Sequence, residues 1–357
     1  MMRVSSRGST PAWKSLKTFT ASTTFSEKAW RVANGLIFAG AGLRVAALLD
    51  RRIRPASPIF SYASYAAILL VVRKIGSIVI GCIAYPAAAC SAWSREYREA
   101  LVRLEADALS GLKMNGYGTQ KISLYKAGVC YDATLVYKQD TAANGKWCIH
   151  ALGNMMAMEE YVREYAEEDS ALGANTLLIN GPAVGRSGGW PTRYQMGAGF
   201  EAGLQFLEKE VNATHIVMKG LSLGGGMFAE AMRAHEFYRS KRYLAIFDRT
   251  FSRLSDVAAA MVARIVRPVF FLAGIQLDTV SGVRKLRDLR IPHIIIQNSD
   301  ASVGGDGVIP NHAGLAGAVT EHVDLVKLMA TQIRHNSDLP SAVQALLDNN
   351  VRQFFAN

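Results

Sequence analysis

A strand, a tight turn and a helix follow one another at residues 214–233, and this segment constrains the fold more than any other. An apolar run at residues 216–218 leads into the pattern G-x-S-x-G at 220–224, which is centred on Ser222. The positions two before and two after the serine must be small, because such a turn holds the serine in a strained backbone conformation. The serine hydroxyl then stands clear of the sheet. The alternative interpretation is a glycine-rich turn with a purely structural role.

Strand-like and helix-like segments alternate after residue 119. The stretches 120–126 and 130–138 are rich in β-branched and aromatic residues and predict two antiparallel strands at a sheet edge. Further strands are expected at 146–151, 175–180, 214–219, 242–247 and 292–297, with helices at 155–171, 192–210, 224–239, about 252–265 and 338–355, and a segment of unassigned type near 278–289. This alternation predicts a mostly parallel, doubly wound sheet covered on both faces, in one large α/β domain over residues 119–357.

The N-terminal third has a different composition. Residues 1–28 are rich in serine, threonine and basic residues, which predicts a disordered basic tail. Residues 29–118 are expected to form an apolar helical segment, in which the uncharged stretches 55–72 and 75–93 approach the length of a membrane span. Arg73 and Lys74 separate them, at a hairpin tip or at a membrane interface. A buried helical cap on the α/β domain is the competing interpretation.

The charge of the chain is concentrated near its start. The net charge is +11, and residues 1–54 contain ten basic and two acidic side chains. A basic flank beside an apolar segment suits an anionic membrane surface, so we expect membrane association through residues 29–93. No nucleic-acid recognition motif is present, and no nucleic-acid partner is expected. If the apolar segment is instead a cap, the expected location is cytoplasmic, or outside the cell by a non-classical secretion route.

Two further motifs accompany the serine turn. Residues 179–187 (INGPAVGRS) resemble the N-Y-x-G-x-G-x-S loop of serine hydrolases, and residues 247–252 (FDRTFS) resemble the D-x-S-F turn that follows their next strand. Together with G-x-S-x-G, these motifs resemble the α/β-hydrolase superfamily over about residues 119–357. Both recur in membrane-anchored hydrolases of the ABHD type and in the chlamydial CHLPS-type group. The resemblance implies an α/β-hydrolase fold and a serine nucleophile.

The resemblance also implies the chain order serine, acid, histidine. Asp306, in a glycine-rich loop after the strand at 292–297, is the favoured acid. Asp300 and Asp248 remain alternatives, although Asp248 corresponds to a structural turn residue in the family comparison. His335, just before the last helix, is the favoured base, and His322 and His312 remain alternatives.

An oxyanion hole needs a second backbone N–H besides that of Leu223, which follows the serine. Hydrolases place it in the loop after the strand equivalent to 146–151, and there Met155 is the candidate. No metal or organic cofactor is expected for this chemistry, and the four cysteines show no metal-ligand spacing.

These residues predict a serine hydrolase that cleaves an ester, thioester or lipid acyl bond through Ser222, His335 and Asp306, at a membrane. The substrate is then a small-molecule or lipid ester of the serine-esterase or lipase-like class. Two other hypotheses stand beside it. One is a catalytically inactive interaction protein on a hydrolase scaffold. The other is a membrane-integral protein whose essential part is residues 29–93.

Overall fold

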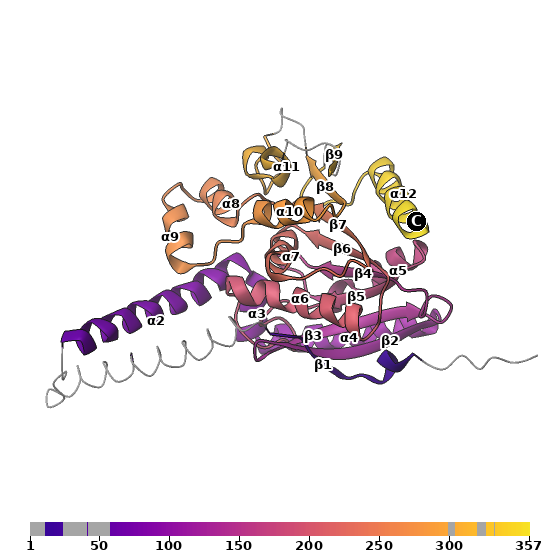
Figure 1. Cartoon of the computed structure of the whole chain (residues 1–357), viewed down its shortest axis with the longest axis horizontal. Helices are drawn as coiled ribbons and strands as arrows, with labels where there is room; N and C mark the ends of the chain where they lie inside the picture. The colour runs from indigo at the N-terminus through magenta and orange to yellow at the C-terminus, as the bar shows by residue number, and fades with distance from the viewer. Residues whose placement is uncertain (1–10, 24–40, 42–57, 299–303, 320–325, 332) are drawn as a thin grey trace, which may run out of the picture.

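A nine-stranded sheet with helices on both faces forms the body of the molecule (Figure 1). The structure is a computed structural model, and it describes residues 11–23, 41, 58–298, 304–319, 326–331 and 333–357. The strands are β1 (Thr18–Thr20), β2 (Tyr117–Lys126), β3 (Val129–Lys138), β4 (Lys146–Ala151), β5 (Asn175–Ile179), β6 (His215–Leu221), β7 (Arg242–Asp248), β8 (His293–Asn298) and β9 (Val326–Thr331). The longer helices are α2 (Pro58–Ala84), α3 (Pro86–Trp93), α4 (Arg95–Met114), α5 (Met158–Ala171), α6 (Arg193–Lys209), α7 (Leu223–Ala234), α8 (Leu254–Met261), α9 (Val266–Ala273), α10 (Thr279–Asp288) and α12 (Ser341–Ala356). Short helical turns are η1 (Ala12–Ser15), η3 (Asn311–Ala313) and α11 (Leu315–Ala318).

The strand order is β1-β2-β3-β5-β4-β6-β7-β8-β9. β3 runs antiparallel to both β2 and β5, and every other neighbouring pair is parallel. The predicted mostly parallel sheet and its antiparallel hairpin are therefore confirmed. β2 is not at the edge, however, because β1 pairs with its outer side.

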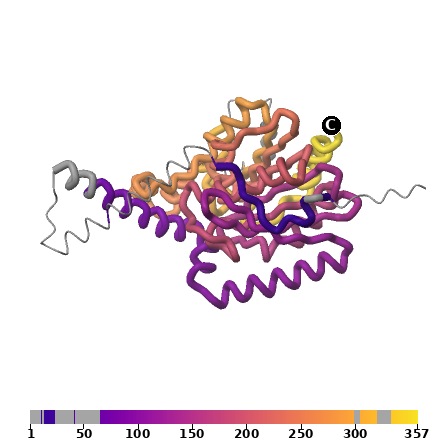
Figure 2. The backbone as a smooth tube through the Cα atoms, turned by 60° about the horizontal axis from the view of Figure 1, so that its bottom comes forward, coloured from indigo at the N-terminus to yellow at the C-terminus, as the bar shows by residue number. Residues whose placement is uncertain are grey.

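Side chains of β6 alternate between two cores. Ile216 and Met218 pack with α6, α7 and α10, whereas Val217 packs with α12 on the other face. The same second face is covered by α4 and α5, which pack around Leu112, Met158 and Val162. In Figure 2, α4 runs along the bottom of the molecule. Residues two apart share a face in a strand, so the near-continuous apolar runs of the central strands fit burial on both sides.

A separate hydrophobic cluster lies outside the two faces of the sheet. It joins Tyr85 and Ala87, at the start of α3, to Phe270 of α9, and it also contains Leu223 and Ile309. This cluster connects the N-terminal helices to the loops around Ser222.

The prediction of a disordered tail over residues 1–28 is wrong for part of the segment. Residues 18–20 form β1, and Trp13 is buried against Trp147 and Tyr137 at ring-centroid distances of 5.4 Å and 5.1 Å. The tail supplies an aromatic anchor, which composition alone does not reveal because Trp13 is a single aromatic residue in a segment rich in serine, threonine and basic residues. Residues 1–10 and 24–28 lie outside the described part of the chain.

The two apolar stretches around Arg73 and Lys74 are not two spans. α2 runs without a break from Pro58 to Ala84, so both basic residues lie inside one helix rather than at a hairpin tip. Within the described residues one candidate membrane span is found, Tyr65–Ala84, and little of it is buried. Residues 29–40 and 42–57 of the predicted apolar segment lie outside the described residues.

Residues 86–114 belong to the folded body rather than to an apolar extension. Ala87 and Ala88 of α3 are fully buried, and α4 packs on α5 and β2. Ser94 caps α4, because its Oγ accepts the Tyr97 N–H at 3.1 Å. Residues 86–114 therefore pack with the sheet, and the domain boundary expected at residue 119 does not separate two independently packed units.

Two elements of the C-terminal half differ from expectation. The helix expected at 252–265 is replaced by two helices, α8 and α9. β9 pairs in parallel with β8, and its sequence VKLMAT does not predict a strand because it has no clear alternation.

Candidate active site

Ser222 occupies the sharp turn between β6 and α7. Its backbone angles, φ 53° and ψ −117°, lie in a region that non-glycine residues rarely adopt. A Cβ on Gly224 would overlap the carbonyl of Ala151, and one on Gly220 would lie 2.6 Å from Gly225 Cα. The two glycines of the motif are therefore required by close backbone contacts. The Ser222 N–H donates to the Asp248 carbonyl at 2.8 Å, which fixes the turn to the end of β7.

His335 reaches Ser222 from the loop before α12. Its Nε2 lies 2.8 Å from Ser222 Oγ, and its Nδ1 lies 2.8 Å from Asp306 Oδ2. A carboxylate only accepts hydrogen bonds, so Nδ1 carries the proton and Nε2 accepts the serine hydroxyl. The His335 N–H also donates to the Asp306 carbonyl at 2.7 Å. Two hydrogen bonds thus hold His335 to the Asp306 loop.

The carboxylate of Asp306 is buried, and both of its oxygens accept hydrogen bonds. Its Oδ1 accepts the N–H groups of Val308 and Ile309 at 3.0 Å and 2.7 Å, while Oδ2 accepts His335. Burial pushes the pKa of Asp306 upward, but these hydrogen bonds outweigh it and hold the pKa below its ordinary value. Asp306 is therefore an anion beside the imidazole at neutral pH.

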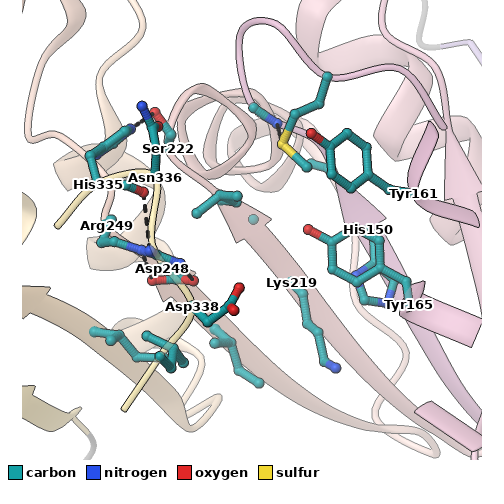
Figure 3. A pocket seen from close by; sticks show the side chains of 18 of the residues that line it. His150, Tyr161, Tyr165, Lys219, Ser222, Asp248, Arg249, His335, Asn336 and Asp338 are labelled. Atoms are coloured by element: carbon teal, nitrogen blue, oxygen red, sulfur yellow. Dashed lines mark hydrogen bonds and ion pairs between the residues drawn. The ribbon is translucent and has the colours of Figure 1, made fainter. Parts of the chain in front are cut away.

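The structure gives Asp248 a different partner. Both of its carboxylate oxygens accept from Arg249, from Nε and from Nη2, each at 2.8 Å. Arg249 Nη1 donates to the carbonyls of Arg334 and His335 at 3.2 Å and 3.0 Å, and also to that of Ser337. Figure 3 shows this pair lying directly beside the His335 loop. Asp248 therefore helps to anchor the loop through Arg249 and does not contact the imidazole.

Asp300 and His322, the remaining candidates for acid and base besides His312, lie outside the described residues. His312 is in η3, and within the described part of the chain the histidine that contacts Ser222 is His335.

Of the two predicted oxyanion donors, one follows Ser222 in the chain and the other lies in the loop after β4. Leu223 is the first residue of α7, where backbone N–H groups have no partner inside the helix. Met155 lines the cavity beside Ser222, in the loop after β4. The carbonyl of Asn154 in this loop accepts the Ala87 N–H at 3.2 Å, so α3 is hydrogen-bonded to the loop and supports it.

A cavity of about 750 Å³ is lined by Ser222 and His335, by residues of α5 and by Gln344 and Leu347 of α12. Figure 3 shows Ser222 and His335 on one side of it and Tyr161 and Tyr165 on the other. Its walls include the ionisable side chains of Tyr165, Glu168 and Lys219. Burial raises the pKa of Glu168 to about 6, against the opposing effect of the nearby Lys219 ammonium. These groups make part of the cavity wall polar.

Lys219 belongs to a buried network below the cavity. Its Nζ lies 2.7 Å from Asp169 Oδ1, while His150 Nε2 and Thr176 Oγ1 lie 2.7 Å and 2.8 Å from Asp169 Oδ2. Burial alone would lower the pKa of Lys219, but the ion pair with Asp169 raises it. Burial lowers the pKa of His150 in spite of Asp169, so this imidazole is neutral at neutral pH.

Within the described residues, one group of carboxylates has ligand atoms close enough together to hold a metal ion. Glu105, Asp132 and Glu159 bring ligand atoms within 4.8 Å of one another. The Lys121 ammonium already lies 2.6 Å from Glu105 and 2.8 Å from Asp132, and Asn180 donates to both oxygens of Glu159 at 2.9 Å. Arg186 Nη2 also lies 3.2 Å from Glu105, so each of the three carboxylates already has a partner within the protein.

A family model described as Chlamydia CHLPS protein (DUF818) matches residues 72–356. The chain belongs to this family. The CHLPS match begins inside α2 and ends in α12, so it includes α3 and α4 as well as the sheet. The resemblance to the CHLPS-type group indicated by the sequence motifs is therefore confirmed.

Solved structures show which fold the CHLPS chain adopts. An α/β hydrolase from Vibrio vulnificus has a TM-score of 0.54 at 16% identity, covering 78% of this chain and 92% of that one. An esterase from Pyrococcus furiosus has a TM-score of 0.49 at 16% identity, covering 69% of this chain and 94% of that one. The first likeness shows an α/β-hydrolase fold. A search of curated proteins found no match.

Sequence reasoning missed three side chains at this CHLPS site. Arg249, Lys219 and Glu168 line the cavity, and none was a candidate. Lys219 had a signal, because it is a charged residue inside an otherwise apolar strand only three residues before Ser222. Arg249 had no comparable sequence signal, since an arginine after a turn aspartate is most often exposed.

Proposed function

We propose that this protein is a serine hydrolase that cleaves an ester, thioester or lipid acyl bond. The observation that carries the proposal is the hydrogen-bonded series from Ser222 Oγ to His335 Nε2 and from His335 Nδ1 to Asp306, each link at 2.8 Å. A nucleophile within reach of a base, with the base oriented by a third group, is the arrangement that activates a serine.

In the proposed reaction, Ser222 Oγ attacks the acyl carbon while His335 Nε2 takes the hydroxyl proton. The imidazolium then gives this proton to the alcohol or thiol leaving group, and the acyl group remains on the serine. A water molecule, deprotonated by His335, attacks the acyl carbon and releases the acid, and Ser222 recovers its proton. Asp306 stays ionised throughout, holds the Nδ1–H tautomer and stabilises the imidazolium.

The oxyanion of each tetrahedral intermediate is assigned to the backbone N–H groups of Leu223 and Met155. The start of α7 adds the favourable dipole of a helix N-terminus. Such donors stabilise charge that develops only in the transition state.

We assign the enzyme to a membrane through α2. Its span Tyr65–Ala84 is long and apolar, and large side chains such as Leu69 and Ile83 are mostly exposed. Because α3 joins this helix to the loop that contains Met155, a membrane-bound α2 would hold the site close to the lipid. Lipid or lipid-linked esters are therefore the proposed substrates.

A misplaced triad, with neither His335 nor His322 near the Ser222 hydroxyl, would favour the hypothesis of an inactive scaffold. The 2.8 Å separation between His335 Nε2 and Ser222 Oγ counts against it.

A fluorophosphonate probe tests the proposal. Folded wild-type protein should be labelled on Ser222, and the Ser222→Ala variant should remain unlabelled at an unchanged melting temperature. Ser281→Ala is a suitable control, because Ser281 lies in α10 and bonds to Asp278 rather than to the site. Folded wild-type protein that resists labelling, or a Ser222→Ala variant labelled as strongly as wild type, would show that the proposal is wrong.

A further inference from the structure

The segment of α8 and α9 carries an apolar surface that faces away from the protein. We call the six side chains Met261, Val262, Ile265, Val269, Phe271 and Leu272 the α9 surface. Val262, Ile265 and Phe271 are 76%, 77% and 75% exposed. Single exposed apolar residues are ordinary, but six within twelve residues form a patch of the kind that marks an interaction site.

Both helices are amphipathic about the hydrophobic cluster beneath them. Leu254 and Val257 of α8, and Phe270 and Ala273 of α9, are buried in that cluster, while the α9 surface points outward. The packing of α8 and α9 is thus complete without these six side chains. Within the described residues, their exposure therefore does not come from an incomplete contact between α8, α9 and that cluster.

The α9 surface adjoins the long apolar helix, although about 190 residues separate the two in sequence. α2 and α9 pack together (Figure 1), and the Arg73 guanidinium lies against Gly274, which ends α9. Leu69, Val72 and Ile75 of α2 are also exposed. Two exposed apolar segments therefore lie side by side at one end of the molecule.

The charges around the α9 surface indicate which kind of partner it binds. No aspartate or glutamate occurs between residues 51 and 95, or between 257 and 277, whereas both segments contain Arg or Lys. Arg264 and Arg267 stand within the α9 surface, and Arg267 also pairs with Asp256 at 3.0 Å. Apolar residues with interspersed cations and no acids are typical of segments that lie on anionic lipid.

We infer that the α9 surface docks onto an anionic lipid bilayer beside α2, lying at the interface without crossing it. The inference rests on the membrane attachment proposed for α2 and not on the hydrolase reaction. The hydrophobic cluster that supports the α9 surface also contains Leu223 and Ile309, the neighbours of Ser222 and of the Asp306 loop.

The test uses the full chain with vesicles of phosphatidylcholine alone or mixed with an equal amount of phosphatidylglycerol. Hydrogen exchange should slow in residues 261–272 when mixed vesicles are added, with no change in α12. Exposed side chains outside the core allow substitution with little effect on folding. The double variant Phe271→Ser with Leu272→Ser should therefore keep its melting temperature but lose this protection, and its affinity for mixed vesicles should fall about tenfold or more.

Matched controls separate the outcomes. Met114→Ser with Leu346→Ser removes two other exposed apolar side chains and should leave binding unchanged. Arg264→Gln should reduce the preference for phosphatidylglycerol by about fivefold. Ser222→Ala should bind as wild type does, so a failure of the hydrolase proposal would not affect this test. Vesicle binding through α2 without protection of residues 261–272, or no binding at all, would overturn the inference.

Discussion

Arg249 Nη1 donates a hydrogen bond to the carbonyl oxygen of His335 at 3.0 Å. The same guanidinium holds both oxygens of Asp248, and the Asp248 carbonyl accepts the Ser222 N–H at 2.8 Å. The nucleophile turn and the histidine loop are therefore tied to the same end of β7. The relative position of Ser222 and His335 depends on this connection as well as on their own hydrogen bond.

Replacing Arg249 should impair the reaction more than the fold. Arg249→Lys keeps the charge but cannot serve the carboxylate and several carbonyls with one planar group, so we expect kcat to fall about 10²-fold with little change in KM. Steady-state kinetics with a soluble thioester and a thermal melt measure the two effects.

Guanidinium rescue distinguishes positioning from general destabilisation. Added guanidinium ion should restore part of the kcat of Arg249→Ala. A kcat that stays low with guanidinium, or a melting temperature that falls in proportion to kcat, would mean that Arg249 has only a structural role.

The two aspartates near the site should respond differently to amidation. Asp306→Asn removes the acceptor that fixes the Nδ1–H tautomer of His335, and kcat should fall about 10⁴-fold. Asp248→Asn still leaves an acceptor for Arg249, so its kcat should fall far less. Kinetics of both variants at one pH provide the comparison, and equal losses would remove the distinction between Asp306 and Asp248.

The buried network below the cavity should matter for stability. Asp169→Asn leaves the Lys219 ammonium and the His150 imidazole without their anion, and should lower the free energy of unfolding by about 3–5 kcal/mol. Glu167→Gln on the same helix breaks only an exposed pair with Arg163 and should cost less than about 1 kcal/mol. Urea unfolding measures both, and similar values for the two variants would contradict the assignment.

The same network predicts a loss of stability in mild acid. His150 is buried with a lowered pKa, so below about pH 6.5 the unfolded chain gains a proton that the folded chain does not take up. The free energy of unfolding should therefore decrease as the pH falls through this range. The pKa of Asp169 is also lowered, which extends the loss to lower pH, below the ordinary pKa of an aspartate.

Glu168 acts in the opposite direction, because its raised pKa of about 6 lets the folded state gain a proton first. The slope is therefore best measured in a Glu168→Gln background, by urea unfolding at about pH 7.5 and about pH 5.5. A His150→Asn variant with the same slope as its parent would exclude His150 as the cause.

Local patterns were enough to predict most elements of the sheet. The alternation in β2 and β3, the apolar run of β6 and the glycines around Ser222 are properties of a few neighbouring residues, so they can be recognised in a single sequence. The order of Asp306 and His335 after Ser222 came from the family resemblance. The structure brings these side chains together, while their catalytic role remains a prediction.

Local sequence patterns did not predict the elements whose conformation depends on tertiary packing. β1 and β9 are short or irregular in sequence and become strands because a neighbouring strand offers its free edge. In the sequence, Arg73 and Lys74 indicated a break between two membrane spans. In the structure both residues lie inside the single helix α2. A long helix can include two cations when their charged groups reach its surface or a neighbouring element such as α9.

The sequence by itself determined the fold class, the serine turn and the candidates for acid and base, because backbone strain and periodic burial are encoded over short stretches. Only the tertiary structure decided that Asp306 and not Asp248 faces His335, that Arg249 anchors the histidine loop, and that α2 and α9 share an exposed apolar end. These relationships join residues far apart in the chain, and their energies arise only when the folded body removes the groups from water and sets their distances.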